Sequence, residues 1–383
     1  MSGTILHIVG ARPQFVKYFA VSKAIRAFAE AHADSISDVL VHTGQHYDYS
    51  MSKIFFDELS IKEPEFHLEV GSGAHGEQTA KVLQRVEETL LKVKPACVLV
   101  YGDTNSTLGG ALAAVKLHIP VCHVEAGLRS YNKSMPEEIN RILTDHSSTV
   151  LFCPSNSSVD SLRKEGFTKI INGGKLVSEQ NVDREIVSSS ITIDTPLVVN
   201  VGDVMYDVLL HATAVAEKRS AILQQLQLTP KKYFLLTLHR AENTDNPQQF
   251  EEIINFVNTI SGETPVIFPM HPRTKKIYER VIRKFDRSVR IIEPAGYFDV
   301  LTLLKNSALL LTDSGGMQKE AYWLQTQCVT LRKETEWVET LEGGWNTLFT
   351  NFTHRTPASS RQSPAYGDGK AAEKIVAVLH KLL

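Results

Sequence analysis

Short apolar runs alternate with amphipathic stretches along almost the whole chain. The runs are rich in β-branched residues and fall into two sets, 4–9, 38–42, 97–101, 119–124 and 149–153, then 233–238, 265–269, 289–292, 307–311 and 327–331. Stretches with helical periodicity separate them, for example 16–31, 76–94, 107–117 and 247–260. Alternation of this kind predicts parallel sheets covered by helices on both faces. Two such sets predict an α/β protein with two Rossmann-like domains.

The segment between the two sets is rich in Ser, Gly and Asn and lacks helical periodicity. We therefore expect an N-terminal domain over 1–172, a linker or insertion over 173–205, and a C-terminal domain over 206–366. Within the linker, 173–196 is long for a connection, which suggests an insertion. A polar loop precedes a last helix, 367–383, which we expect to pack back on the first domain.

Composition excludes several classes of protein. The formal net charge is −2 over 383 residues, which indicates neither a nucleic-acid partner nor a membrane surface. No apolar run approaches the ~18 residues of a membrane-spanning helix, and the first residues do not resemble a signal peptide. The four cysteines lie in or beside apolar runs without CxxC spacing, namely Cys97, Cys122, Cys153 and Cys328. They are typical of buried thiols in a reducing compartment, so we expect a cytoplasmic protein.

Charged or Gly-rich motifs follow most of the predicted strands. They are Gly10 to Lys17, His42 to His46, Gly102 to Ser106 and Glu125 to Ser130 in the first half, and His239 to Asn243, His271 to Arg273, Thr312 to Glu320 and Arg332 to Glu339 in the second. Ligands of open α/β sheets bind outside the carboxyl ends of the strands. If the two sheets face each other, all of these turns line one cleft.

The motif from Thr312 to Glu320 predicts a strand that turns through Ser314, Gly315 and Gly316 into a helix. Glycines permit close approach, and the free N–H groups of a helix start bind anions. A diphosphate fits such a turn, and Glu320 could accept two hydrogen bonds from a ribose diol. The alternative is a plain strand–turn–helix corner capped by Ser314.

Other charged residues are candidates for phosphate binding and proton transfer. Arg12 and Lys17 could reach a phosphate, or could simply be a solvated helix start. Asp103, Glu125 and Glu137 lie at or near strand ends, where neighbouring carboxylates shift one another's pKa and serve as acid and base. Their alternative roles are helix caps and surface charges.

Two histidines, His239 and His271, end strands in the second half, where a structural role is the alternative to a functional one. The chain contains no GxGxxG, GxxxxGK[ST], HExxH or GxSxG motif. These absences argue against tightly bound NAD, a P-loop and a zinc site. We therefore expect no cofactor and no metal, and acid–base chemistry on a phosphate-bearing substrate.

Taken together, these motifs resemble the non-hydrolysing UDP-N-acetylglucosamine 2-epimerase family. Matching segments run in order over about residues 5–350, and also include Pro136 to Arg141, Gly202 to Asp207 and Leu331 to Asn346. The resemblance implies a GT-B fold with two Rossmann-like domains facing across a cleft, a homodimer, a UDP-sugar substrate, and no metal or NAD. It also implies a role in making precursors of cell-surface polysaccharides.

The resemblance further implies a mechanism, in which UDP and the C2 proton are eliminated to a glycal and UDP adds back with a proton on the opposite face. It assigns acid–base roles to Asp103, Glu125 and Glu137, with His239 near the leaving phosphate. The substrate and UDP would be bound by the other matching residues, Arg12, Lys17, Arg141, His271, Arg273, Ser314, Gly315, Gly316 and Glu320. The carboxylate that removes the proton stays unassigned.

The chain departs from the commoner family pattern at three places. Gln45-His46-Tyr47-Asp48 replaces the Gln-His-Arg-Glu of members activated by their substrate, and 173–196 matches nothing in the family pattern. Residues 332–339, together with Gly10 to Phe15, resemble the branch acting on UDP-2,3-diacetamido-2,3-dideoxy-glucuronic acid. Both that sugar and UDP-N-acetylglucosamine stay open as substrates. A GT-B glycosyltransferase, a hydrolysing epimerase and a nucleotide-sugar sensor are the competing functions.

Overall fold

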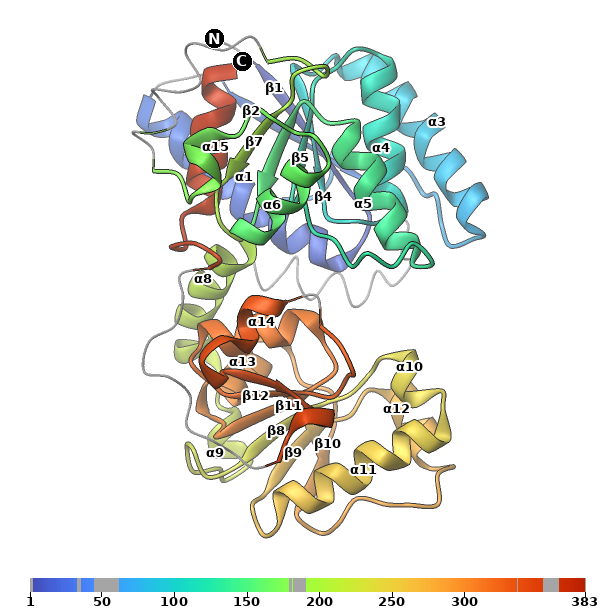
Figure 1. Ribbon diagram of the computed structural model, residues 1–383, viewed down its shortest axis with the longest axis vertical. Coiled ribbons are helices and arrows are strands. Elements are labelled where there is room, and N and C mark those ends of the chain that lie inside the picture. The colour runs from blue at the N-terminus through green and yellow to red at the C-terminus, as the bar shows by residue number, and fades with distance from the viewer. Residues whose placement is uncertain are drawn as a thin grey trace. The chain divides into compact units, whose positions relative to one another are not determined.

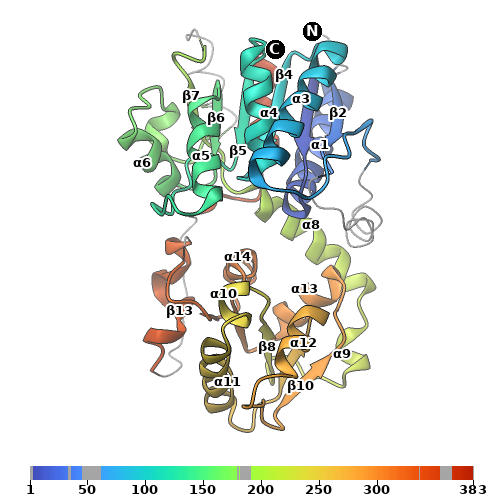
Figure 2. The same ribbon diagram turned by 90° about the vertical axis from the view of Figure 1, so that its right-hand side faces the viewer.

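The computed structural model describes residues 3–32, 36–44, 62–178, 181, 191–335, 337–353 and 365–382, without the side chains of Arg12, Ala241 and Pro272. The chain divides into two compact units. Unit 1 comprises Met1–Val208 and Pro364–Leu383, and unit 2 comprises Leu209–Ser363. Each is an α/β unit built on one parallel sheet (Figures 1 and 2). The predicted fold class, α/β with two Rossmann-like domains, is therefore confirmed.

Unit 1 contains a parallel sheet of seven described strands in the order β3-β2-β1-β4-β5-β6-β7. The strands are β1 Thr4–Val9, β2 Ser37–His42, β3 Phe66–His67, β4 Cys97–Tyr101, β5 Val121–Val124, β6 Val150–Cys153 and β7 Leu197–Asn200. The order reverses between β1 and β4, which puts the ligand crevice of such a sheet at their carboxyl ends.

Helices cover both faces of this sheet (Figure 1). They are α1 Arg12–His32, α3 His75–Val93, α4 Asn105–Lys116, α5 Pro136–His146, α6 Asn156–Lys164, α15 Ala371–Leu382 and the short η1 Ile171–Gly174. Leu6 and Ile8 of β1 pack with α3 and α4 in one apolar core, whereas α1 contacts β1, β2 and β4 and also packs against α15. Alternate residues of one buried strand thus serve two helical layers.

Unit 2 repeats this architecture with six described strands in the order β10-β9-β8-β11-β12-β13. They are β8 Phe234–Thr237, β9 Val266–Pro269, β10 Val289–Ile292, β11 Leu309–Thr312, β12 Cys328–Thr330 and β13 Asn346–Leu348. The helices are α9 Ile222–Gln225, α10 Ala241–Thr244, α11 Pro247–Ser261, α12 Pro272–Tyr278, α13 Tyr297–Asn306, α14 Gly315–Trp323, η2 Val338–Gly344 and η3 Phe349–Asn351. Phe234 and Leu236 face α11, while Tyr233 and Leu235 face α13 and α14.

The predicted linker over 173–205 is wrong at its C-terminal end. Residues 197–200 form β7, which pairs in parallel with β6 at the edge of the first sheet. Helix α8, Val204–Arg219, follows, and unit 1 continues to Val208 inside it. Residues 179–180 and 182–190 of the predicted insertion lie outside the described residues. The C-terminal helix belongs to unit 1, where His380 of α15 contacts the ring of Phe28 on α1.

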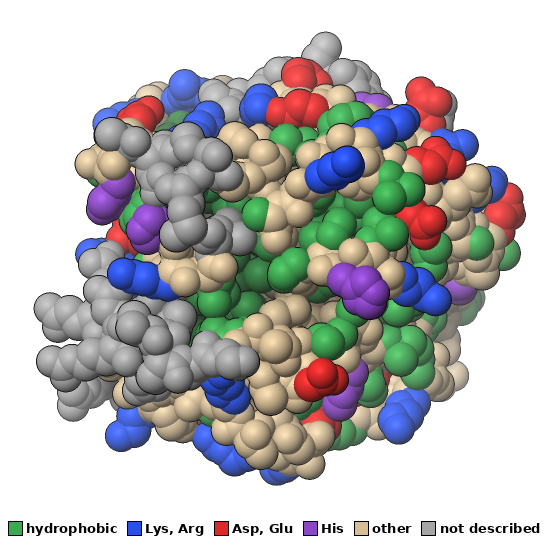
Figure 3. Space-filling view, turned by 90° about the horizontal axis from the view of Figure 1, so that it is seen from above, with side chains coloured by type: hydrophobic (Ala, Val, Ile, Leu, Met, Phe, Trp, Pro, Cys, Tyr) green, Lys and Arg blue, Asp and Glu red, His purple; other side chains and the backbone are tan. Residues whose placement is uncertain are grey.

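The end of unit 1 seen in Figure 3 shows hydrophobic side chains at its centre and charged side chains mostly towards its rim. None of the described helices is long and apolar enough to cross a membrane. The described part of the chain also contains no cluster of three or more His, Cys, Asp or Glu side chains that could hold a metal ion.

Candidate active site

The turn after β4 carries Asp103 at the switch point of the first sheet. Gly102 permits this turn by adopting a φ of +63°. Arg141 of α5 donates a hydrogen bond of 2.9 Å from Nη1 to Oδ2 of Asp103. The side-chain amide of Asn140 donates to the backbone oxygen of Asp103 at 2.9 Å. Helix α5 thus holds both the backbone and the carboxylate of this turn.

The electrostatic surroundings of Asp103 raise its pKa. Burial is the largest cause, and the nearby charges of Glu125 and Glu137 act in the same direction. Arg141 and Lys17 oppose the shift. Four charged groups therefore lie within electrostatic reach of Asp103, and all of them are among the site residues predicted from the sequence. A carboxyl whose pKa is raised in this way holds its proton more readily than an ordinary aspartate does.

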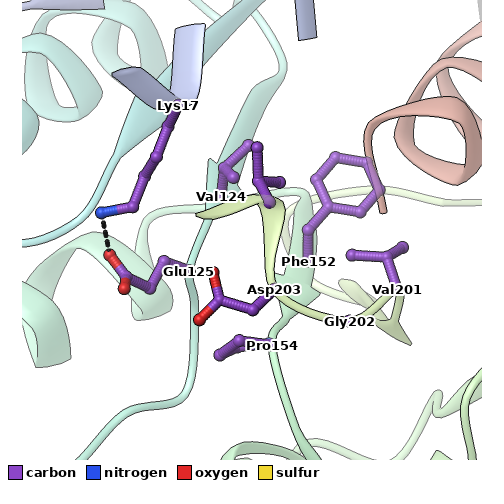
Figure 4. A pocket seen from close by; sticks show the side chains of 9 residues that line it. Lys17, Val124, Glu125, Phe152, Pro154, Val201, Gly202 and Asp203 are labelled. Carbon is purple, nitrogen blue, oxygen red and sulfur yellow. Dashed lines mark ion pairs between the residues drawn. The ribbon is translucent and has the colours of Figure 1, made fainter. Parts of the chain in front are cut away.

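Glu125 follows β5 directly and forms an ion pair with Lys17 of α1 (Figure 4). Both side chains are nearly buried, with 12% and 7% of their surface exposed. The backbone of Glu125 has a φ of +76°, which a residue with a side chain adopts only when its surroundings hold it there. The strained backbone therefore orients this carboxylate, and strain of this kind is common at functional positions.

Lys17 and Glu125 line a small pocket at the carboxyl ends of β5, β6 and β7 (Figure 4). The other lining residues are Val124, Phe152, Pro154, Val201, Gly202, Asp203 and Val204. Asp203 had received no role from the sequence, although it lies in the matching segment 202–207. Its Oδ1 accepts a hydrogen bond of 2.8 Å from the backbone N–H of Met205. No separate signal in the sequence singles out Asp203, because Gly-Asp before a helix is also an ordinary cap.

The first turn of unit 1 is fixed by Gln14. Its Oε1 accepts the backbone N–H groups of Gly10 and Ala11 at 2.7 and 3.0 Å, and its Nε2 donates to the backbone oxygen of Tyr101 at 2.5 Å. Gly10 has no room for a side chain, since a Cβ there would lie 2.1 Å from Oγ of Ser106. This clamp joins the ends of β1 and β4. It positions the backbone of Arg12, whose side chain lies outside the described structure.

The two glutamates at the start of α5 differ in their surroundings. Glu137 is exposed, whereas 1% of Glu138 is exposed. The carboxylate of Glu138 accepts the backbone N–H groups of Ser130 and Tyr131, each at 2.9 Å, and pairs with Arg141 at 3.0 Å. Burial would raise the pKa of Glu138, but these hydrogen bonds and Arg141 lower it below its usual range. Glu138 thus organises the loop before α5 and orients Arg141, a role that sequence reasoning missed.

In unit 2, Asp313 joins the ends of β8 and β11. Its carboxylate is fully buried and accepts the backbone N–H groups of His239 and Arg240 at 3.0 and 2.9 Å. The ring of His239 lies 3.1 Å from Asp313 through Nδ1 and keeps 55% of its side chain exposed. Burial would raise the pKa of Asp313, but the contacts with His239 and Arg240 lower it. His239 is therefore anchored from behind and presents its other ring nitrogen outwards.

The turn after β11 has the predicted strand–turn–helix form. Ser314 caps α14 by accepting the N–H of Met317 at 3.4 Å, and Gly315 and Gly316 open the helix. A Cβ at Gly316 would meet only Oγ of Ser314, at 3.9 Å, so this exposed glycine leaves free space. Glu320, one turn further, is 7% exposed and accepts a hydrogen bond of 3.0 Å from Tyr297. Ser314 can therefore cap α14 and also belong to a ligand-binding turn.

His271 and Arg273 lie at the end of β9. His271 caps α12 by accepting the N–H of Arg273 at 3.3 Å. Arg273 is half exposed and pairs with Asp245 at 2.7 Å. The structure thus brings His239, His271 and the Ser314 turn to the carboxyl ends of the unit 2 strands. Gln45, His46, Tyr47 and Asp48, the predicted departure from the family pattern, lie outside the described residues.

Comparison with known proteins points to one family. Residues 29–380 match the family model described as UDP-N-acetylglucosamine 2-epimerase. The chain is 47% identical to a UDP-N-acetylglucosamine 2-epimerase homolog of Methanococcus maripaludis and 43% identical to the UDP-2,3-diacetamido-2,3-dideoxy-D-glucuronate 2-epimerase of Pseudomonas aeruginosa, each over 99% of both chains. It is also similar to the Methanocaldococcus jannaschii UDP-GlcNAc 2-epimerase solved with UDP-GlcNAc and UDP, with a TM-score of 0.77, 38% identity and 99% coverage of both chains. The fold class is therefore the GT-B-like one of these enzymes.

Proposed function

The chain belongs to the UDP-N-acetylglucosamine 2-epimerase family, and from that premise we propose that it inverts C2 of a UDP-2-acetamido sugar without hydrolysis. UDP-N-acetylglucosamine would become UDP-N-acetylmannosamine. The observation that supports this most strongly is the group formed by Asp103, Glu125 and Lys17 in unit 1, with one carboxyl of raised pKa and one carboxylate paired with an ammonium.

The chemistry explains why such a group is needed. The C2 proton of this sugar is not acidic, because no free carbonyl group adjoins it. Elimination avoids this difficulty: the C1–O bond to UDP breaks, a base takes the C2 proton, and a C1–C2 double bond forms. UDP then adds back to C1 while an acid delivers a proton to the other face of C2. These two reaction steps involve no net oxidation. They require two proton-transfer groups and a site that stabilises departing UDP.

We assign the proton transfers to unit 1. Glu125, held by Lys17, would act in its ionised form as the base, and Asp103 would carry the proton for the opposite face. A carboxyl of raised pKa beside a carboxylate paired with an ammonium suits such a division of roles. Glu137, exposed beside Asp103, is the third member of the set. Arg141 would keep Asp103 oriented and contribute positive charge near the substrate.

We assign UDP binding to unit 2. The free N–H groups at the start of α14 and the open space at Gly316 suit a diphosphate. Glu320 would accept the ribose hydroxyls, and His271 and Arg273 would add donors at the end of β9. His239, whose exposed ring is anchored by Asp313, would donate to the leaving phosphate. A cation or donor placed there stabilises the charge that develops on UDP.

The test is proton NMR of UDP-N-acetylglucosamine incubated with the enzyme in heavy water. We expect deuterium at C2 and a manno product that is still attached to UDP. Free N-acetylmannosamine would instead indicate the hydrolysing reaction. No exchange would contradict the proposal and favour a glycosyltransferase or a sensor. The Glu125→Gln variant is the matched negative control for contaminating epimerase.

A second substrate is favoured by one comparison. The relative of 43% identity acts, by its name, on the 2,3-diacetamido uronic acid. The same NMR experiment with that UDP sugar decides between the two, since the preferred substrate is the one with the larger kcat/KM. Both sugars undergo the same bond changes at C1 and C2, so the roles assigned above hold for either.

We further propose that the enzyme works as a homodimer in the cytoplasm, supplying a precursor for cell-surface polysaccharides. The exposed Ile139 and Leu143 on α5 support an interface between copies. Light scattering on the purified chain should give twice the monomer mass of 42.7 kDa. A monomer at micromolar concentration would contradict this part of the proposal.

A further inference from the structure

A cluster of four charged side chains lies next to the turn that carries Glu125, and we call it the Asp145 cluster. It consists of His123 of β5, Arg129 of the following loop, Asp145 near the end of α5, and Glu165 just after α6. His123 and Asp145 are fully buried, and 1% of the Arg129 side chain is exposed. Buried charges are costly unless they are paired, so a cluster of this kind needs a reason.

Asp145 is the centre of the cluster. Its Oδ1 lies 2.6 Å from Nδ1 of His123, and its Oδ2 lies 2.7 Å from Nη1 of Arg129. Arg129 in turn forms two hydrogen bonds with Glu165, at 2.7 and 2.8 Å. Burial would raise the pKa of Asp145, but the charges and hydrogen bonds of His123 and Arg129 lower it. Asp145 is thus ionised, and both of its oxygens accept hydrogen bonds.

The cluster contacts the backbone on both sides of the acid–base group. Nε2 of His123 lies 2.8 Å from the backbone oxygen of Gly102, the residue before Asp103. Oδ2 of Asp145 accepts the backbone N–H of Gly127, two residues after Glu125, at 3.1 Å. The two ring nitrogens of His123 therefore face two acceptors, Oδ1 of Asp145 and the backbone oxygen of Gly102. One buried carboxylate therefore ties the turn of Asp103 to the turn of Glu125.

The turn of Glu125 needs such support. Its left-handed backbone, with φ of +76°, is strained for a residue with a side chain. The backbone oxygen of Phe152 accepts the N–H groups of Glu125 and Ala126, at 3.1 and 3.0 Å, on one side of the turn. On the other side, Asp145 accepts the N–H of Gly127, whose φ is +79°. Without Asp145, the chain would be free to relax at the residue whose carboxylate pairs with Lys17.

We propose that Asp145, acting through His123 and the Gly127 N–H, is a positioning residue that fixes the relative placement of Asp103 and Glu125. The alternative is a buried ion pair that contributes only to stability. An apolar cluster would serve stability as well or better. The contacts instead go to the two backbone positions that place the reacting carboxylates. This inference rests on the proposed function, because it concerns proton transfer by those residues.

The first variant is Asp145→Asn, which keeps the size of the side chain and removes its charge. We expect kcat to fall ~100-fold, as for a misplacement of reacting groups by about 1 Å, while the KM for the UDP sugar changes less than ~3-fold. The matched control is Asp160→Asn, which removes an exposed aspartate that pairs with Arg163 in the same unit and touches neither turn. If Asp145→Asn does not fold, His123→Asn and His123→Gln replace it. The asparagine of His123→Asn can keep the contact with Asp145, and the longer glutamine of His123→Gln can keep the contact with Gly102.

The readout that separates positioning from stability is the fate of the C2 deuterium. In heavy water, deuterium enters recovered substrate when one face of the glycal is reprotonated and enters product when the other face is. We expect the ratio of the two to change in Asp145→Asn, because Glu125 and Asp103 no longer hold the same relative placement. A variant that is only less stable has fewer folded molecules, but each folded molecule gives the same ratio of deuterium in recovered substrate to deuterium in product. An unchanged ratio with unchanged kcat, or with a loss that follows the melting temperature, overturns the proposal.

Hydrogen exchange of the backbone gives an independent arm. We expect peptides covering 123–131 and 101–104 to exchange at least ~10-fold faster in Asp145→Asn than in wild type at a temperature where both are folded, with 234–238 of unit 2 unchanged. If wild type turns over neither sugar, the proposed function fails, yet this arm still tests whether Asp145 holds both turns. Unchanged exchange in both peptides overturns the proposal whatever the activity.

Discussion

Arg141 donates one hydrogen bond of 2.9 Å to Asp103 and so ties α5 to the turn at the end of β4. The other end of its guanidinium pairs with the buried Glu138 at 3.0 Å. Asp103 keeps 34% of its side chain exposed, while Glu138 keeps 1%. One arginine thus connects a carboxylate that is open to a substrate with one that is closed to solvent. This division predicts which carboxylates affect turnover and which affect stability.

Asp103 and Glu125 should be needed for turnover and dispensable for binding UDP. We expect Asp103→Asn and Glu125→Gln each to lower turnover at least ~100-fold, because each removes one of the proposed proton-transfer groups. The dissociation constant for UDP, measured by calorimetry, should stay within ~3-fold. Glu77→Gln is the control, since it removes an exposed carboxylate that pairs with Lys81 on α3. Normal turnover in both variants would refute the assigned roles.

The adjacent glutamates of α5 should separate activity from stability. Glu138→Ala leaves the Arg141 guanidinium and two backbone N–H groups without their buried partner, so we expect a loss of roughly 3 kcal/mol in the free energy of unfolding. Glu137→Ala, at an exposed position, should change it by less than ~0.5 kcal/mol and should lower turnover. Urea unfolding and the NMR assay on both variants test this. Equal losses of unfolding free energy in Glu138→Ala and Glu137→Ala would show that the buried contacts of Glu138 do not stabilise the fold.

The sequence predicted the two sheets because most of their strands coincide with short apolar runs that alternate with helical stretches. It missed β3, β7 and β13. Leu197–Asn200 pairs with β6, and its short Leu-Val-Val run lies in a segment rich in Ser, Gly and Asn, whose overall composition favours a linker. The linker prediction was wrong there for that reason.

The candidate site residues that follow strands directly were predictable. Asp103 and Glu125 lie at strand ends of unit 1, and His239 and Ser314 at strand ends of unit 2, where the topology of each parallel sheet brings such residues to one edge. Helix α5 does not follow the rule that apolar residues face the core. Glu138, Arg141 and Asp145 face inwards, while Ile139 and Leu143 are exposed. Apolar periodicity would assign the wrong face of this helix to the core. Local rules fail most often at functional sites, and the inverted face of α5 is consistent with that tendency.

Gly316 should be needed for ligand binding and not for folding. A Cβ there would meet only Oγ of Ser314 at 3.9 Å, and alanine is well tolerated in a helix. In the proposed UDP site the methyl group would occupy the space through which the diphosphate approaches the N–H groups of α14. We expect Gly316→Ala to weaken UDP binding ~10-fold, or about 1.4 kcal/mol, with an unchanged melting temperature. Gly76→Ala, another open helical glycine, is the control, and unchanged UDP affinity in Gly316→Ala would place the diphosphate elsewhere.

Asp207 should make the stability of unit 1 depend on pH. Its carboxylate accepts the N–H groups of Ala371 and Ala372 at the start of α15, at 3.1 and 2.7 Å. Burial is the largest effect on its pKa, which rises from 3.8 to about 7 despite these hydrogen bonds, and Asp203 and Asp368 add to the rise. A pKa that is raised by folding means that the folded state binds the proton more tightly. The corresponding stability is complete below about pH 4 and is lost as the pH rises to about 7.

The Asp207→Asn variant isolates this effect, because asparagine keeps a capping oxygen and does not titrate in this range. Urea unfolding followed by circular dichroism at pH 4 to 8 should show wild type losing roughly 2 kcal/mol relative to the variant between pH 4 and pH 7, after allowance for partial exposure of the carboxylate. The difference should then stay constant above pH 7. Asp160→Asn, at an exposed position, should run parallel to wild type throughout. Parallel curves for wild type and Asp207→Asn would mean that the cap at α15 binds no proton in this range, and that its hydrogen bonds outweigh burial.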